Sequence, residues 1–350
     1  MQEVTFTLQT ITPLFLAGAD QTKAELRAPS FRGLMRYWQR ALVGGMVGTD
    51  ARGLQEVMKQ EMAIFGATDT GSAVSVRVSN ATSVPKEFTE QVSVNIGGKW
   101  QATGKGYLLW TMVRSGRADK GNLKPARWYF PAGTNFELTL STRGTDDTHY
   151  KQAIAAFWLL THLGSIGSRS RRCAGSITVE SFKGNTADFQ FSTPKSIDDL
   201  QAQIKQGIEY ARSLYNIRPT SVKDAMFDIL SPNTCTIRIL HYDNQPWLTA
   251  EAAMKAIGES LQKYRSSIFP LLKRKIFGLP LRDVSNARRA SPLLLRVTEI
   301  QGEKGKQYVG VAVLFKTTEK DPLGRLISTK DYALIEDWFT TFSGKGKVTL

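Results

Sequence analysis

A basic and flexible segment spans residues 164–176 and reads GSIGSRSRRCAGS. It holds three glycines, four serines and three arginines, so little of it can fill a hydrophobic core. Glycine adopts positive φ angles readily, which lets successive backbone amides turn inward and bind an anion. We predict a phosphate-holding loop with charge from Arg169, Arg171 and Arg172, because guanidinium groups bind phosphate in a bidentate manner. The backbone of this loop would hold the phosphate at Gly164, Gly167, Ser168, Ser170 and Gly175.

This loop matches neither common nucleotide-binding motif. It contains no G-x-x-x-x-G-K-[ST] sequence, which is the signature of a P-loop. It follows an expected helix and precedes an expected strand, the reverse of the setting of the dinucleotide fingerprint. The pattern therefore favours the backbone of an RNA or DNA strand over a mononucleotide, and a mobile surface turn is the alternative.

A second group of arginines recurs every four residues in a helix expected to begin near Ser30. Arg32, Arg36 and Arg40 share one face of this helix, and Arg27 lies just before it. Residues four apart are neighbours on a helix surface. No acidic residue on that face stands at this spacing to offset the repulsion. We therefore expect contact with phosphate or with a partner, and a solvated face is the alternative.

A third basic group lies within residues 273–297, which read KRKIFGLPLRDVSNARRASPLLLRV. The first three residues are expected to end a helix, where cations also offset the helix dipole. The dipole does not account for the arginines of the loop that follows. The predicted RNA-binding residues of this group are Lys273, Arg274, Arg282, Arg288 and Arg289.

The composition supports a polyanionic partner. The chain has 350 residues, 41% hydrophobic, and a formal net charge of +15. A protein this basic usually binds nucleic acid or, less often, an anionic membrane surface. The alternative is that the proteins of its source are basic in general.

Two cysteines without a C-x-x-C pattern favour a reducing compartment. The first residues read as a strand rather than a signal peptide, and the most apolar window is too short for a membrane span. We expect a cytoplasmic protein that does not engage a membrane.

Residues for catalysis or metal binding are sparse. His149, His162 and His241 stand far apart and form no metal-ligand spacing. His162 ends an apolar helix, where a packed role is expected, and Asp20 is a loop carboxylate without a visible partner. We therefore expect no catalytic residues, no metal and no cofactor.

The hydrophobic periodicity predicts an α+β protein of two ferredoxin-like (RRM-like βαββαβ) domains with elaborations. The first half reads as a strand, a helix, several strands including 106–113, a helix and a strand. The second half repeats this order more loosely, with a hairpin across residues 301–306. The expected parts are an N-terminal domain at 1–182, a helical connection at 183–232 and a C-terminal domain at 233–350.

Three segments carry a family resemblance, and they read ITPLFLAGADQTKAELRAPSFRGLMRYWQRAL, HLGSIGSRSRRCAGSI and FGLPLRDVSNARRASPLLLRV. Together they resemble the RAMP superfamily, and they are most similar to the subunit-one family of the Cmr complex, the type III-B CRISPR effector. The first segment is the most specific of the three. The resemblance spans most of the chain and is least distinctive at 183–232 and at the extreme C-terminus.

The resemblance implies two ferredoxin-like domains and a non-catalytic subunit near the 3′ end of the guide RNA. Such a subunit lies at the head of the complex beside other RAMP subunits and helps to engage target RNA in antiviral defence. The basic residues of the first helix, the glycine-rich loop and the second domain would then face guide RNA and target RNA. Two alternatives stay open. One is a RAMP endoribonuclease that uses Asp20 or His162 on guide precursor or target RNA, and the other is an assembly cap whose arginines meet acidic protein partners.

Overall fold

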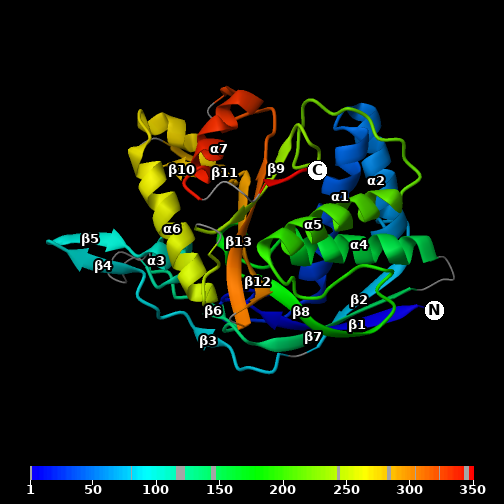
Figure 1. Cartoon of the computed structure of the whole chain (residues 1–350), viewed down its shortest axis with the longest axis horizontal. Coiled ribbons are helices and arrows are strands. Elements are labelled where there is room, and N and C mark those ends of the chain that lie inside the picture. The colour runs from blue at the N-terminus through cyan, green and yellow to red at the C-terminus, as the bar shows by residue number, and fades with distance from the viewer. Residues whose placement is uncertain are drawn as a thin grey trace.

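Two four-stranded antiparallel sheets organise the chain in the computed structural model (Figure 1). The structure describes residues 2–79, 81–115, 123–142, 147–242, 245–281, 285–303, 305–322, 324–342 and 347–350. The result is a mixed α+β fold, as the sequence predicts. Within these ranges no helix is both long enough and apolar enough to cross a lipid bilayer.

The first sheet has the strand order β2-β7-β1-β8. Its strands are β1 (Glu3–Thr10), β2 (Val74–Val78), β7 (Asn135–Thr142) and β8 (Ile177–Gly184). Its helices are α1 (Ala28–Val47) and α2 (Ala51–Phe65), which follow β1, and α4 (Asp147–Leu163), which precedes β8. In β1 the side chains of Val4, Phe6 and Leu8 are fully buried, because alternate residues of a strand share one face. The strand and its buried face are therefore as the sequence predicts.

The second sheet has the strand order β12-β13-β9-β16. Its strands are β9 (Cys235–Leu240), β12 (Leu293–Gly302), β13 (Gly305–Phe315) and β16 (Lys347–Val348). Its helices are α6 (Ala250–Ser267) and α7 (Ala333–Phe339). The register from Leu293 opposite Leu314 to Gly302 opposite Gly305 confirms the hairpin predicted for this part of the chain.

The second sheet is buried on both faces. Val309, Val311 and Val313 of β13 pack into the core that also holds α1 and α4. Ala312 and Leu314, which point the other way, pack into the core formed with α6 and α7. Figure 1 shows this sheet between the two groups of helices. The halves thus share a hydrophobic core, and the division at residues 182 and 232 stays a prediction.

Several elements differ from their prediction. The apolar run at 106–113 forms a helix, α3 (Gly104–Leu109), and a 3-10 turn, η1 (Trp110–Met112), instead of a strand. Thr103 caps α3, since its hydroxyl accepts a hydrogen bond from the Gly106 amide at 2.9 Å. The first long helix begins at Ala28 rather than Ser30, with proline in its first turn.

The remaining elements complete the fold. They are β3 (Lys86–Glu87), β4 (Ser93–Ile96), β5 (Lys99–Ala102), β6 (Trp128–Tyr129), η3 (Ser170–Arg172), α5 (Ile197–Ser213), η4 (Leu271–Phe277), β10 (Leu279–Leu281), β11 (Ser285–Arg289), β14 (Glu319–Lys320), β15 (Leu326–Ile327) and η5 (Thr329–Tyr332). Lys273 and Arg274 lie on the short 3-10 helix η4, with Arg274 in its last turn, in line with the expected end of a helix. Arg288 and Arg289 lie on strand β11, which corrects the prediction of a loop.

Helices α3 and α6 meet through two glycines. A Cβ atom at Gly258 would lie 1.9 Å from the carbonyl oxygen of Gly104, and one at Gly104 would lie 2.1 Å from the carbonyl oxygen of Lys255. Such distances are far inside van der Waals contact, and the obstructing atoms belong to the backbone. The absence of side chains at these two positions therefore fixes how closely α3 approaches the second half.

We expect Gly258→Ala to lower the free energy of unfolding by about 1–3 kcal/mol, the usual effect of overpacking. Gly33→Ala is the matched control, because Gly33 lies in α1 and a Cβ atom there meets no atom within 4 Å. Gly33→Ala should raise the free energy of unfolding by about 0.5–1 kcal/mol, because alanine has a higher helix propensity than glycine. Urea unfolding of both variants tests the contact, and equal effects of the two would contradict it.

Candidate nucleic-acid interface

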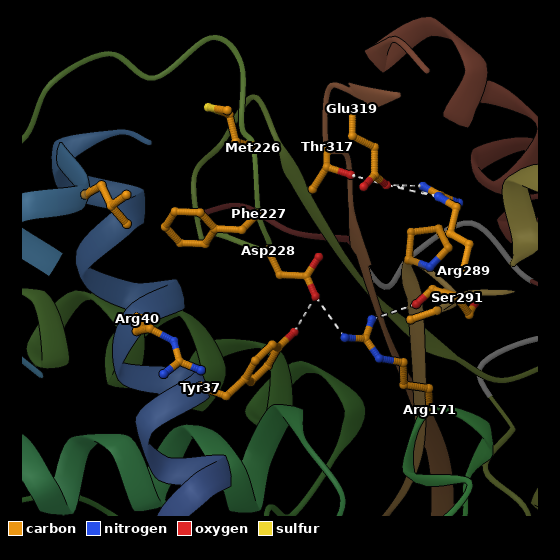
Figure 2. A pocket seen from close by; sticks show the side chains of 13 residues that line it. Tyr37, Arg40, Arg171, Met226, Phe227, Asp228, Arg289, Ser291, Thr317 and Glu319 are labelled. Carbon is orange, nitrogen blue, oxygen red and sulfur yellow. Dashed lines mark hydrogen bonds and ion pairs between the residues drawn. The ribbon is translucent and has the colours of Figure 1, made fainter. Parts of the chain in front are cut away.

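Two adjoining clefts lie where the two halves of the chain meet. The first cleft, of about 500 Å³, lies between α1 and the segments around Asp228, Ser291 and Glu319 (Figure 2). The second cleft, of about 720 Å³, is lined by α3, the glycine-rich loop, α6 and β11. Arg171 and Arg289 line both clefts, so the two are adjacent, and together they are called the groove below. The basic residues of the second cleft are Lys124, Arg169, Arg171, Arg172, Arg265, Arg288 and Arg289.

The first cleft is organised around the carboxylate of Asp228. This carboxylate accepts hydrogen bonds from the Tyr37 hydroxyl at 2.7 Å and from Arg171 Nη2 at 2.9 Å (Figure 2). The other terminal nitrogen of Arg171 donates to the Ser291 carbonyl at 2.6 Å. Burial, together with the charge of Asp228, raises the pKa of Tyr37 well above its ordinary value, so the phenol stays protonated. Arg171 therefore ties the glycine-rich loop to both walls of the cleft, with its charge largely neutralised.

The arginines of α1 have partners that their own helix does not provide. Glu61 of α2, only 6% exposed, forms ion pairs with both Arg36 and Arg40. Arg32 donates to the carbonyl of Phe65 at the end of α2. Helix α1 itself therefore offers these arginines no acidic partner, as the sequence indicates, and the neighbouring helix α2 supplies the compensating carboxylate. Of the predicted residues in this group, Arg40 lines the first cleft, whereas Arg27, Arg32 and Arg36 line neither cleft.

The glycine-rich loop packs against the protein instead of forming an open nest. The amides of Ser168 and Gly175 donate to the carbonyls of Phe15 and Pro13 at 2.8 and 2.9 Å, and the Gly164 amide donates to Leu160. Gly175 has a φ of +66°, and a Cβ atom there would lie 1.8 Å from a backbone oxygen. These three amides are therefore unavailable to a phosphate, which corrects the prediction for them. Ser170 lines the second cleft.

The three arginines of this loop differ in exposure. Arg172 is 9% exposed and donates to the Phe277 carbonyl at 3.1 Å. Arg169 Nε donates to the Leu108 carbonyl at 2.6 Å, which joins the loop to α3. Burial lowers the pKa of Arg169 to about 10 and, with the charges of Arg169 and Arg265, that of Arg172 to about 9. Both guanidiniums remain charged at neutral pH and face the second cleft.

The structure brings part of the third basic group to the same groove. Arg289 pairs with Glu319 at 2.8 Å, and the neighbouring Arg288 is exposed on β11 and lines the second cleft (Figure 2 shows the Arg289 pair). Lys273 and Arg274 line neither cleft. Arg282 lies outside the described residues.

Three residues of the groove and one residue of the neighbouring core are not predicted from the sequence. Lys124, Trp110 and Arg265 line the second cleft, but no local pattern marks them. Arg296 lies behind the groove, is 2% exposed, and donates to the carbonyls of Gly164 at 3.0 Å and Ile177 at 2.9 Å. An arginine in the middle of the apolar strand LLLRV is a signal that could have revealed this buried role.

The two candidate catalytic residues lie in different settings, His162 in the core and Asp20 at the surface. His162 is stacked on Trp158, with ring centroids 4.0 Å apart, and its Nδ1 donates to the Trp158 carbonyl at 2.8 Å. Burial lowers the pKa of His162 to about 3. Asp20 is exposed, and hydrogen bonds from Thr22 lower the pKa of its carboxyl group. Across the described ranges, no three His, Cys, Asp or Glu side chains gather as a metal site would require.

The buried His162 predicts a pH dependence of stability. An unfolded histidine titrates near pH 6.5 and the folded one near pH 3, so the unfolded state binds more protons in between. This contribution to stability is complete above about pH 6.5 and falls as the pH drops, by about 2 kcal/mol at pH 5. Urea unfolding at pH 7.5 and pH 5 should show a smaller decline for His162→Phe than for the original protein. His149→Phe is the control, and an unchanged decline in His162→Phe would refute the assignment.

Known proteins of similar sequence identify the family. The sequence profile of the RAMP superfamily matches residues 7–178. The Cmr subunit Cmr1-2 of Pyrococcus furiosus is 34% identical over 192 residues, which cover 51% of this chain and 96% of that protein. The subunit Cmr1-1 of the same organism is 27% identical over 300 residues, which cover 84% and 81% of the two chains.

Solved structures share the fold. The crystal structure of apo Cmr1 from Pyrococcus furiosus has a TM-score of 0.65 at 24% identity and covers 97% of this chain and 96% of its own. A chain of the type III-B Cmr-beta complex bound to cognate target RNA has a TM-score of 0.56 at 13% identity, with coverage of 97% and 99%. With 96% of a relative covered at 34% identity, the chain belongs to the RAMP superfamily and, within it, to the Cmr1 family.

Proposed function

We propose that this chain is an RNA-binding subunit of a type III-B Cmr effector complex and that RNA follows the groove formed by the two clefts. One observation carries the proposal. The fold gathers arginines from three distant parts of the sequence, represented by Arg40, Arg171 and Arg288, along one groove. Its relatives are Cmr subunits, and one structural neighbour belongs to a complex with target RNA bound.

The charge distribution indicates how RNA would bind. In the first cleft, Asp228 and Glu319 neutralise Arg171 and Arg289. The second cleft has no carboxylate among its described lining residues, so its positive potential is the stronger. Such a groove attracts the phosphate backbone irrespective of sequence. In a guided complex base pairing reads the sequence, and the protein needs only to hold the strands.

The finer role follows from the family resemblance. We propose that the subunit caps the 3′ end of the guide RNA, helps to engage target RNA and contacts neighbouring RAMP subunits in the cytoplasm. Both sheets support a ferredoxin-like interpretation of the two halves. Numbered along the chain within each half, their strands lie in the order four-one-three-two with antiparallel neighbours, which is compatible with the βαββαβ arrangement.

The proposed role is binding without catalysis. A general base for RNA cleavage must reach the 2′-hydroxyl and titrate near the working pH. His162 is buried against Trp158 and its pKa is about 3. Asp20 lies outside both clefts and its carboxyl pKa is lowered. These settings favour the binding role over the endoribonuclease alternative.

The exposed cations of the second cleft should set the salt dependence of RNA binding. Arg288→Gln/Lys124→Gln removes two charges from this cleft. Fluorescence anisotropy with single-stranded RNA across a chloride series should show a slope of log K against log salt that is shallower by about 1.4, at about 0.7 per phosphate contact. Arg218→Gln/Lys205→Gln is the matched control, since both residues are exposed and line neither cleft. Equal slopes for the two double variants would place RNA elsewhere on the surface.

The non-catalytic role has a direct test. Labelled single-stranded RNA should stay intact with the purified chain, both in EDTA and with Mg²⁺ or Mn²⁺. Denaturing gels over hours provide the measurement, with Asp20→Asn and His162→Gln in parallel. Cleavage by the original protein that either substitution abolishes would establish the endoribonuclease instead.

A further inference from the structure

Three guanidinium groups in the lining of the second cleft lie close enough for their charges to repel one another. Arg169 and Arg172 come from the glycine-rich loop, Arg172 from a 3-10 turn within it, and Arg265 comes from α6. Arg265 Nη1 donates to the Tyr107 hydroxyl at 2.6 Å, and its guanidinium lies 5.4 Å from the centre of the Phe277 ring. Arg172 donates to the carbonyl of the same Phe277. Neutral groups therefore hold all three cations in place.

This cluster lacks the charge compensation found next to it. Arg171 and Arg289 each have a carboxylate within 3 Å, whereas Arg169, Arg172 and Arg265 have none in the described part of the chain. The Arg265 Nε atom is also buried without a hydrogen-bond partner among the described residues. The dipole of α6 accounts for one cation in its last turn, but not for two more from another element. Arg172 is buried and the other two arginines are partly buried, and like charges removed from water are unfavourable unless an anion joins them.

An exposed aromatic ring stands beside this cluster. Trp110 is 57% exposed and lines the same cleft. It follows α3, whose residues Tyr107 and Leu108 make the contacts to Arg265 and Arg169. An exposed indole offers a stacking surface for a base, and every base has a suitable face. The cleft volume of about 720 Å³ lies within the range of small-ligand sites.

We propose that the second cleft is a subsite for one unstacked nucleotide of single-stranded RNA. Arg169, Arg172 and Arg265 bind its phosphate, and Trp110 stacks on its base. This inference rests on the proposed RNA-binding function and adds a requirement of its own. The RNA must leave one base free of its neighbours at this point, so a continuous duplex does not fill the subsite.

The stacking contact separates the subsite from general RNA binding. Anisotropy is measured with the full chain on a fluorescein-labelled single-stranded RNA and on an abasic ribose-phosphate strand of the same length. We expect Trp110→Ala to weaken binding of the normal strand by about 5- to 100-fold and to leave binding of the abasic strand unchanged. Trp100→Ala is the matched control, because Trp100 is 70% exposed on β5 and lines neither cleft.

Each other outcome has a distinct meaning. If Trp110→Ala weakens both strands equally, or neither, or if Trp100→Ala has the same effect, the subsite is overturned while RNA binding stands. If the original protein binds neither strand, the proposed function itself fails and the subsite fails with it. If an oligoglutamate peptide competes as well as RNA and is equally sensitive to Trp110→Ala, the cleft takes an acidic protein segment instead.

The phosphate contact has its own readout in thermal unfolding. Inorganic phosphate should raise the Tm of the original protein above its value in chloride of equal ionic strength, and Arg265→Gln should lose most of this gain. In chloride, Arg265→Gln should change the Tm little, because relief of repulsion among the three cations offsets the lost contacts to Tyr107 and Phe277. Arg274→Gln is the control, since Arg274 packs over Phe269 outside the clefts. A lower Tm of Arg265→Gln in chloride with an undiminished gain from phosphate would show a purely structural role and overturn the phosphate site.

Discussion

The buried guanidinium of Arg296 is the contact that holds the glycine-rich loop to the second sheet. Arg296 belongs to β12 of the second sheet, yet it donates to the carbonyls of Gly164 and Ile177, which stand at the two ends of the glycine-rich loop. Taking such a charge out of water costs several kcal/mol, and burial lowers its pKa to about 9. The carbonyls that end α4 offset this cost because the C-terminus of a helix carries partial negative charge. One side chain thus fixes both ends of the loop against the second half.

The groove shows two ways of handling positive charge. In the first cleft, Asp228 and Glu319 neutralise arginines that join the two halves of the chain. Those cations stabilise the contact between the halves. On the other side the described lining carries cations without carboxylates, so that side retains its charge for an external anion. The contrast arises within a few residues, since Arg171 and Arg172 point to different partners. The direction of two adjacent side chains thus decides which arginine joins the halves of the chain and which one faces an external anion.

Local patterns predict the regular elements well and the site only in part. The alternation in β1 and the hairpin of β12 and β13 could be predicted because each depends on residues close in sequence. The helix at Gly104–Leu109 could not be predicted, because its apolar run fits a strand equally well. The contact with α6 selects the helix. Arg40, Arg172 and Arg288 are selected from the sequence and line the groove, and their contact with RNA stays a prediction. Partners such as Glu61 and Asp228 lie on other elements, which a single sequence does not reveal.

The sheet that is buried on both faces has a consequence for biosynthesis. A ribosome delivers α1 and α4 well before it delivers β13, whose Val309, Val311 and Val313 cover their apolar side chains. Because translation proceeds from the N-terminus, the nascent first half must wait with an incomplete core. The apolar side chains of α1 and α4 that face β13 therefore stay uncovered until residue 315 has emerged from the exit tunnel.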